Sequence, residues 1–146
     1  MPDPDRHDKI FVSRHDAHGK RACRSTREIE QFPTAQGFQV LYPEDHPIGE
    51  QVSLFRDART FAGLAGSGLF HLSFCEPKRV IIIWPESYSA RNDYLISSVI
   101  GHELTVFWCT PDRGHPEGGW DVTAYQSTYA FDFERDGERL AEVLAD

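Results

Sequence analysis

A glycine-rich stretch, GLAGSGLFH at residues 63–71, constrains the fold of this 146-residue chain more than any other feature. It follows a short apolar run at 60–62 and precedes two apolar segments, at 69–74 and 80–84. Glycine permits a close approach of the backbone, and the N–H groups at the start of a helix attract anions. The stretch therefore predicts a strand, a turn and a helix that together bind a phosphate, with an ordinary tight turn as the alternative.

The rest of the chain alternates predicted strands with predicted helices. Strands are expected at 9–13, 38–42, 60–62, 80–84 and 104–109. Helices are expected at 25–36, 48–58, from about 67, at 90–101 and at 136–144. This order predicts an α/β, Rossmann-like three-layer sandwich with a mainly parallel sheet. Because ligands bind such sheets beyond the carboxyl ends of the strands, Ser13–Arg14 and Gly63–Gly68 are expected to share one crevice.

Local signals predict how the helices begin and which side they bury. Ser25 and Glu28 fit a capping box at the start of the first helix, and Gly37 is its stop signal. Apolar spacing predicts one buried face on each of two later helices. These faces are Tyr94, Leu95, Val99 and Ile100 on one helix, and Leu140, Val143 and Leu144 on the other.

Composition narrows the class of protein. The formal net charge of −8 argues against a nucleic-acid partner, although residues 6–27 carry a local excess of positive charge that suits a small anion. Three widely spaced cysteines predict free thiols rather than disulfides. No segment approaches the ~20 apolar residues of a membrane span, and residues 1–8 lack a signal-peptide core. A cytoplasmic protein is expected, with a disordered segment at 1–8 and one domain at 9–146.

Several blocks in order resemble glycosyltransferase family 61. Lys9–Arg14, Arg21 and the helix ending at Gly37 resemble the start of its nucleotide-sugar domain. The block at 50–58 and the glycine turn at 63–69 resemble its next two motifs. Further similarity extends over 72–85 and 131–136, so the resemblance spans roughly residues 9–145.

The resemblance implies the C-terminal half of a GT-B glycosyltransferase that takes a nucleoside-diphosphate sugar as its donor. Family members transfer sugars such as xylose, arabinose or N-acetylglucosamine, usually with inversion and without an essential metal. Bacterial relatives work in capsular polysaccharide synthesis. The family's N-terminal domain has no counterpart in this sequence, so that domain or a second copy of the chain is an expected partner, and neither a cofactor nor nucleic acid is expected.

Seven residues are predicted to bind the substrate. Arginine forms charge-assisted, bidentate bonds to phosphate, so Arg14 and Arg21 are the first candidates for the diphosphate. The others are the turn and its neighbours: Ser13, Gln51, Gly66, Ser67 and Gly68. His71 is expected to be a hydrogen-bonded core histidine. No catalytic base is identified, and the resemblance implies that the missing half supplies it.

Three alternatives stay open. Ala65 and Leu64 stand where the family has histidine and proline, and Ile82 stands where it has glutamate. These departures allow an inactive, truncated or degenerate homologue that serves as a binding or interaction module. His15, Asp16 and His18 allow a metal site, although the segment is basic. A general Rossmann cofactor site ranks last, because no GxGxxG motif follows the first strand.

Overall fold

A computed structural model of the chain describes residues 8–15 and 20–146. Its five strands are β1 (Lys9–Val12), β2 (Gln39–Leu41), β3 (Thr60–Leu64), β4 (Arg79–Pro85) and β5 (Glu103–Cys109). The α-helices are α1 (Thr26–Ala35), α2 (Ile48–Asp57), α3 (Asn92–Ile100), α4 (Val122–Tyr125) and α5 (Phe133–Ala145). Two 3₁₀ helices, η1 (Pro43–Asp45) and η2 (Ser67–Phe74), complete the described elements. The segment at 1–7, which includes most of the predicted disordered N-terminus, lies outside the described residues.

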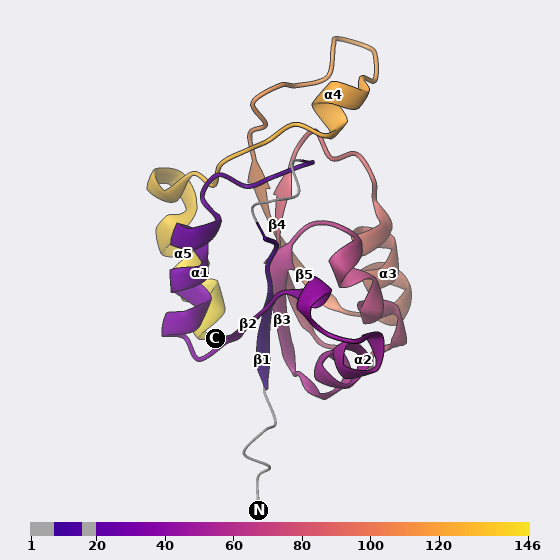
Figure 1. The fold of residues 1–146 in the computed structure, drawn as a ribbon. Coiled ribbons are helices and arrows are strands. Elements are labelled where there is room, and N and C mark those ends of the chain that lie inside the picture. The colour runs from indigo at the N-terminus through magenta and orange to yellow at the C-terminus, as the bar shows by residue number, and fades with distance from the viewer. Residues whose placement is uncertain (1–7, 16–19) are drawn as a thin grey trace, which may run out of the picture.

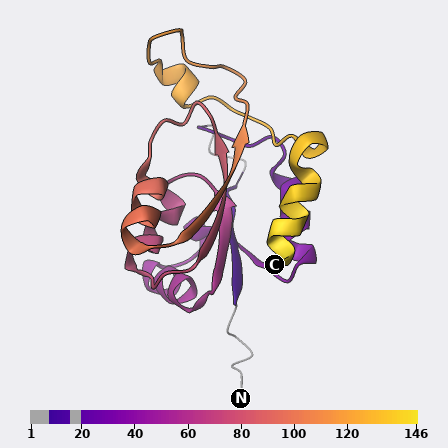
Figure 2. The same ribbon diagram turned by 180° about the vertical axis from the view of Figure 1, so that it is seen from behind.

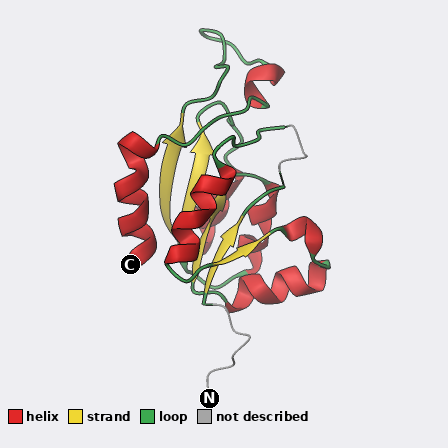
Figure 3. Ribbon diagram, turned by 60° about the vertical axis from the view of Figure 1, so that its left-hand side comes forward, coloured by secondary structure: helices red, strands yellow, loops and turns green. Residues whose placement is uncertain are grey.

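The strands form one parallel sheet in the order β2-β1-β3-β4-β5, with helices on both faces. Helices α1 and α5 cover one face, while α2, η2 and α3 cover the other (Figures 1 and 2). Figure 3 shows the same layers by element type. The predicted α/β three-layer sandwich is therefore confirmed.

Side chains of β4 alternate between two apolar cores, one on each face of the sheet. Ile81 and Ile83 join the core under α1 and α5, whereas Val80, Ile82 and Trp84 join the core under α2, η2 and α3. Both faces of a central parallel strand are covered, which explains why β4 is an unbroken apolar run.

The chain reverses its winding direction between β1 and β3. From β1 it crosses to β2 on one side, and it then returns past β1 to β3 on the other. Ligands of doubly wound sheets bind at such a switch point, outside the carboxyl ends of the two strands. Val12 is in register with Gly63. The ends of β1 and β3 are therefore neighbours, while the crevice expected to be shared by Ser13–Arg14 and Gly63–Gly68 stays a prediction.

Close packing of β1 on β3 explains the first glycine of the glycine-rich stretch. A Cβ atom on Gly63 would lie 2.7 Å from the carbonyl oxygen of Val12 and 3.3 Å from Leu69 Cδ2. Strand β3 also runs two residues beyond its predicted end, to Leu64, and the element that follows is a 3₁₀ helix. The true turn is therefore short and centres on Ala65 and Gly66.

The predicted capping box does not form. Ser25 is the N-cap of α1, yet its side chain makes no capping hydrogen bond. Its Oγ atom instead accepts a hydrogen bond of 3.1 Å from the backbone N–H of Phe131. A long-range contact to the segment before α5 has displaced the local one.

The predicted buried face of α3 is wrong. Tyr94, Leu95 and Val99 are exposed, with exposed fractions of 55%, 56% and 83%. The helix instead buries Asp93 and Ser97, each 2% exposed. The contacts of α3 with η2 and β5 fix its rotation and override the apolar spacing. The buried face of α5, in contrast, contains Leu140, Val143 and Leu144 as predicted.

The three cysteines are buried free thiols. Burial raises the pKa of Cys23 and Cys75, and it raises that of Cys109 to about 12. Thiolate chemistry is therefore disfavoured at all three positions. Within the described part of the chain, the helices are too short or too polar to cross a membrane.

Candidate functional site

The candidate site lies at the carboxyl edge of the sheet, where β1 ends at Val12 and β3 ends at Leu64. Figure 1 shows α4 and its flanking loops beyond this edge. The segments that follow the five strands carry most of the side chains described below. Their positions follow from the parallel register, because parallel strands deliver their carboxyl ends to one side.

Ser13 and Arg14 directly follow β1 and differ in burial. Ser13 is completely buried, and its hydroxyl donates a hydrogen bond of 2.6 Å to Glu30 Oε1 on α1. The hydroxyl of Tyr42 donates to the same oxygen at 2.6 Å. The single proton of the Ser13 hydroxyl is thus engaged in a hydrogen bond within the protein. Arg14, which is half-buried, is the first cation after β1.

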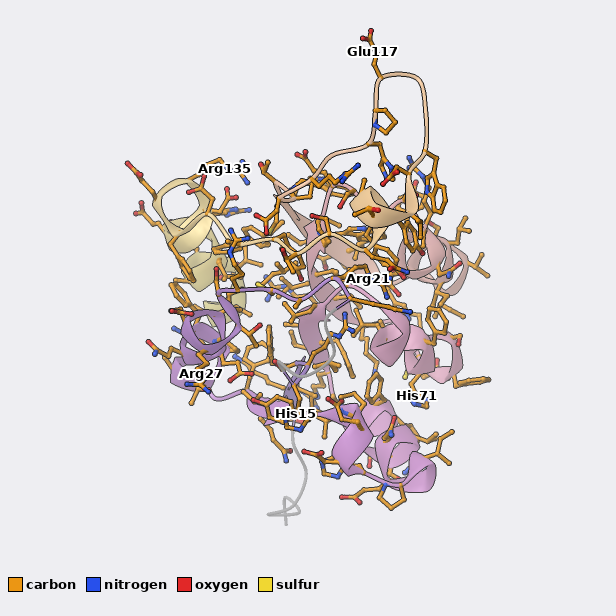
Figure 4. All side chains as sticks on the ribbon, turned by 45° about the horizontal axis from the view of Figure 1, so that its top comes forward. His15, Arg21, Arg27, His71, Glu117 and Arg135 are labelled. Carbon is orange, nitrogen blue, oxygen red and sulfur yellow. The ribbon has the colours of Figure 1, made fainter. Side chains whose placement is uncertain are left out.

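Arg21 is held above two tyrosine rings. Its guanidinium carbon lies 4.3 Å from the ring centre of Tyr88 and 5.5 Å from that of Tyr125. Its backbone adopts a φ of 53°, and its N–H donates to the carbonyl oxygen of Gln126 at 3.0 Å. Figure 4 shows Arg21 near the middle of the view, with His15 and His71 closer to α2.

Both arginines are free of acidic partners among the described residues and can therefore bind an anionic ligand. Neither Arg14 nor Arg21 forms an ion pair with another residue in 8–15 or 20–146. The Nε atom of Arg21 is buried and has no hydrogen-bond partner in that same part of the chain. Because Arg21 rests on aromatic rings, its charge is positioned without being neutralised.

The N–H of Gly66 in the glycine turn faces the carboxyl group of Asp93. Gly66 has a φ of 151°, and its N–H points at Asp93 Oδ2 over 3.4 Å. Asp93 is 2% exposed, and burial raises its pKa to about 6. Its Oδ1 atom has no partner among the described residues. The N–H of Gly66 is thus occupied. Ser67 and Gly68 begin η2, and the first N–H groups of a helix have no partner within it.

Gln51 joins its own helix, α2, to two other segments through its side chain. Its amide nitrogen donates to the carbonyl oxygens of Pro43 and His46, at 2.6 and 2.9 Å. Its amide oxygen bonds His71 Nε2 at 2.9 Å. His71 is half-buried and packs edge-on against Phe55, as expected of a core histidine. Gln51 therefore holds η1, α2 and η2 together.

His15 is the described member of the alternative metal site, since Asp16 and His18 lie outside the described residues. Its Nε2 atom lies 2.8 Å from Asp45 Oδ2, and its ring stacks on Tyr42 at 4.2 Å. The hydrogen bond to Asp45 raises the pKa of His15. The described residues contain no group of three His, Cys, Asp or Glu side chains arranged to hold a metal ion.

The positions that depart from the family resemblance lie in the interior. Leu64 and Ala65 are 4% and 3% exposed, and the N–H of Ala65 donates to the carbonyl oxygen of Ile83. Ile82 is completely buried in the middle of β4, opposite Gly63. These three side chains therefore contribute packing at the base of the site.

Sequence reasoning missed four residues at this edge: Tyr88, Asp93, Trp120 and Tyr125. Tyr88 follows β4, so the rule that located Arg14 after β1 would have found it. Trp120 and Tyr125 follow β5 at a distance, in a segment without a sequence pattern. Asp93 lies outside the predicted buried face of its helix, and only the rotation of α3 brings it inside.

Comparison with known families agrees with this arrangement. Residues 1–82 match the family described as Glycosyltransferase 61. The matched segment includes all seven predicted substrate-binding residues and ends within β4. A search of curated proteins gave no match. Because the family match covers more than half of the chain, this protein belongs to glycosyltransferase family 61.

Proposed function

We propose that this chain binds a nucleoside-diphosphate sugar at the carboxyl edge and serves as the donor-binding half of a GT-B glycosyltransferase in polysaccharide synthesis. The observation that carries the proposal is that two features follow neighbouring strands, β1 and β3, at the switch point of the sheet. These features are the cations Arg14 and Arg21 and the glycine turn at Gly66. Family membership supports a sugar nucleotide as the anion that they bind.

The proposed chemistry is stabilisation of the leaving group. Glycosyl transfer releases a nucleoside diphosphate, whose negative charge grows as the bond to the sugar breaks. Arg14, Arg21 and the N–H groups of Ser67 and Gly68 are the groups that would bind this charge. A well-placed donor at a developing oxyanion is worth roughly 3 kcal/mol. The acceptor hydroxyl needs a base, which we assign to a partner domain.

The guanidinium groups also make a metal ion unnecessary in this proposal. Two arginines supply the positive charge that a divalent cation supplies in many phosphate sites. Binding of nucleotide is therefore expected to be the same in excess chelator as in magnesium. A strict requirement for a divalent cation would contradict the proposed arginine-based site.

Calorimetric titration with UDP tests the proposal. We expect binding by the wild-type chain and a loss of roughly 10- to 100-fold in affinity for Arg14→Ala and Arg21→Ala, the range for a charge-assisted hydrogen bond. Arg139→Ala is the matched control, because Arg139 lies on α5, on the far face of the sheet. Equal affinity in all four proteins would contradict the site.

The outward face of α3 favours a second candidate function, an interaction module that pairs with another copy of the chain. This face carries Asn92, Tyr94, Leu95, Ser98 and Val99, and none of these side chains is charged. In a chain with a formal net charge of −8, it is a surface on which two copies meet without bringing like charges together. Helix η2 packs beside α3 and exposes Phe74 to 80%.

Light scattering tests this second candidate. We expect a dimer for the wild-type chain and a monomer for Val99→Glu, because the new charge would be buried in the contact. Glu142→Gln on α5 is the control, since it alters charge on the opposite face. A wild-type monomer at high protein concentration would contradict this interface.

A further inference from the structure

A series of aromatic rings leads from Arg21 to the surface at the carboxyl edge. Arg21 lies over Tyr88 and Tyr125, whose ring centres are 5.3 Å apart. Trp120 is the next ring outward, with its centre 5.6 Å from that of Tyr125. Tyr88 is 6% exposed and Trp120 is 60% exposed. The series therefore begins at a half-buried cation that rests on a buried tyrosine, and it ends at an exposed indole.

The loop that carries Trp120 is braced on both sides. His115 Nδ1 accepts a hydrogen bond of 3.1 Å from the N–H of Asp121, and His115 Nε2 donates to the carbonyl oxygen of Ser87 at 2.8 Å. The first bond closes the loop after β5 on itself, and the second ties this loop to the segment after β4. Asp121 Oδ1 then caps α4 by accepting from the N–H of Ala124 at 2.9 Å.

This bracing means that the indole of Trp120 is exposed in a fixed position. Its ring lies nearly parallel to that of His115, at 6.2 Å and 24°. A large apolar ring exposed to water is unfavourable on its own, and a rigid one loses little entropy when a ligand covers it. The structure thus presents a flat apolar surface that remains 60% exposed beside the rings of His115 and Tyr125.

The spacing of this surface from Arg21 matches a particular class of ligand. The guanidinium carbon of Arg21 lies 5.5 Å from the Tyr125 ring, and Trp120 lies 5.6 Å beyond that ring. Together these two distances set an upper limit on the separation between the Arg21 guanidinium group and the Trp120 ring. That limit is about the length of one nucleotide. A ligand with a diphosphate at one end and a flat base at the other can occupy both.

We propose that Trp120 is the stacking platform for the base of the bound nucleotide, at the outer end of the site that Arg21 begins. The inference rests on the proposed function, because it needs the diphosphate on Arg21. Base stacking on an aromatic ring tolerates any base, so Trp120 contributes affinity rather than a choice between bases. It assigns a role to a loop that lies beyond the segment matched to the family.

The test compares UDP with inorganic pyrophosphate, which has no base. We expect Trp120→Ala to weaken UDP binding roughly 5- to 150-fold, the range for one base stacked on an aromatic side chain, and to leave pyrophosphate binding unchanged. Trp120→Phe retains a ring and should restore most of the UDP affinity. Arg21→Ala should weaken both ligands.

Tryptophan fluorescence supplies a second readout with a matched control. Trp120 and Trp108 are the two exposed tryptophans, and Trp108 lies on β5, so UDP should quench the emission of Trp108→Ala but not that of Trp120→Ala. Wild-type affinity for UDP in Trp120→Ala, with binding still lost in Arg21→Ala, would overturn the platform and leave the proposed function standing. If Trp120→Ala lost binding to a chito-oligosaccharide but kept wild-type affinity for UDP, the Trp120 ring would belong to the acceptor site. That result would also overturn the stacking platform. Failure of the wild-type chain to bind UDP, GDP or ADP would overturn both proposals.

Discussion

Helices α5 and α3 lie on opposite faces of the sheet and use their amphipathic sequences in opposite ways (Figure 1). Helix α5 buries Leu140, Val143 and Leu144 and turns its charged side chains to water. Helix α3 buries Asp93 and Ser97 and turns Leu95 and Val99 to water.

This difference distinguishes a helix whose burial serves stability from a helix whose burial points to a function. A helix whose pattern agrees with its burial, such as α5, is explained by packing alone. A helix that breaks the pattern carries a cost, and such violations concentrate at functional sites. In α3 the buried Asp93 faces the glycine turn of the candidate site, and the exposed apolar side is a candidate interface.

Matched leucine truncations should show the largest contrast. Leu140→Ala on α5 is expected to lower the free energy of unfolding by about 2–5 kcal/mol, because it leaves a cavity in the core. Leu95→Ala on α3 is expected to lower it by less than about 0.5 kcal/mol, since Leu95 is 56% exposed. Urea unfolding at a low protein concentration measures both. Similar losses in the two variants would contradict the rotation described for α3.

The pH dependence of stability should report the buried carboxyl of Asp93. Burial raises its pKa from 3.8 to about 6, so the folded chain binds more protons than the unfolded chain between these pH values. Stability therefore falls as the pH rises through this window, by at most about 3 kcal/mol. Asp93→Asn should remove this component from unfolding measurements at pH 4 and pH 7.5. If the free energy of unfolding depended on pH in the same way in Asp93→Asn and in the wild type, the burial described for Asp93 would be contradicted.

Glycine replacements sharpen the comparison at the switch point. Gly63→Ala should destabilise the chain by about 1–3 kcal/mol, because the new Cβ atom would lie 2.7 Å from a backbone oxygen. Gly49→Ala in α2 is the control, since no atom lies within 4 Å of its added Cβ, and there a gain of up to about 1 kcal/mol is expected. Thermal unfolding compares the two, and equal effects would contradict the close packing of β1 on β3.

A smaller effect should distinguish the real role of Ser25 from the predicted cap. Ser25→Ala leaves the N–H of Phe131 without its partner and should cost about 1–2 kcal/mol. Glu28→Ala should cost almost nothing, because Glu28 is exposed and Ser25 makes no capping bond. Chemical unfolding of both variants measures this difference. A larger loss of stability in Glu28→Ala than in Ser25→Ala would contradict this account and support the predicted capping box.

The sequence predicted the strands and the parallel sheet because these depend on short apolar runs and on the alternation of strands with helices. Patterning also predicted the buried side of α5, where local spacing and tertiary packing agree. It failed at α3 and at Ser25 because contacts between distant segments decide the outcome there. No local signal could reveal that Ser25 bonds Phe131, which lies 106 residues away in the sequence.

The candidate site was predictable in part for the same reason. Arg14 and the turn at Gly66 come soon after strands, so the rule that parallel strands end at one edge of the sheet assigns both to that edge. Asp93 and Trp120 reach the edge through helix rotation and a braced loop, and those depend on packing that spacing does not encode.

Backbone NMR of the ¹⁵N-labelled chain during titration with UDP tests the central claim most directly. The account predicts that shift changes concentrate at Arg14, Arg21, the turn from Gly66 to Gly68 and the loop near Trp120, while α5 stays unchanged. Saturable shifts on the α1 and α5 face, or no shifts at millimolar UDP, would contradict a nucleotide site at the carboxyl edge.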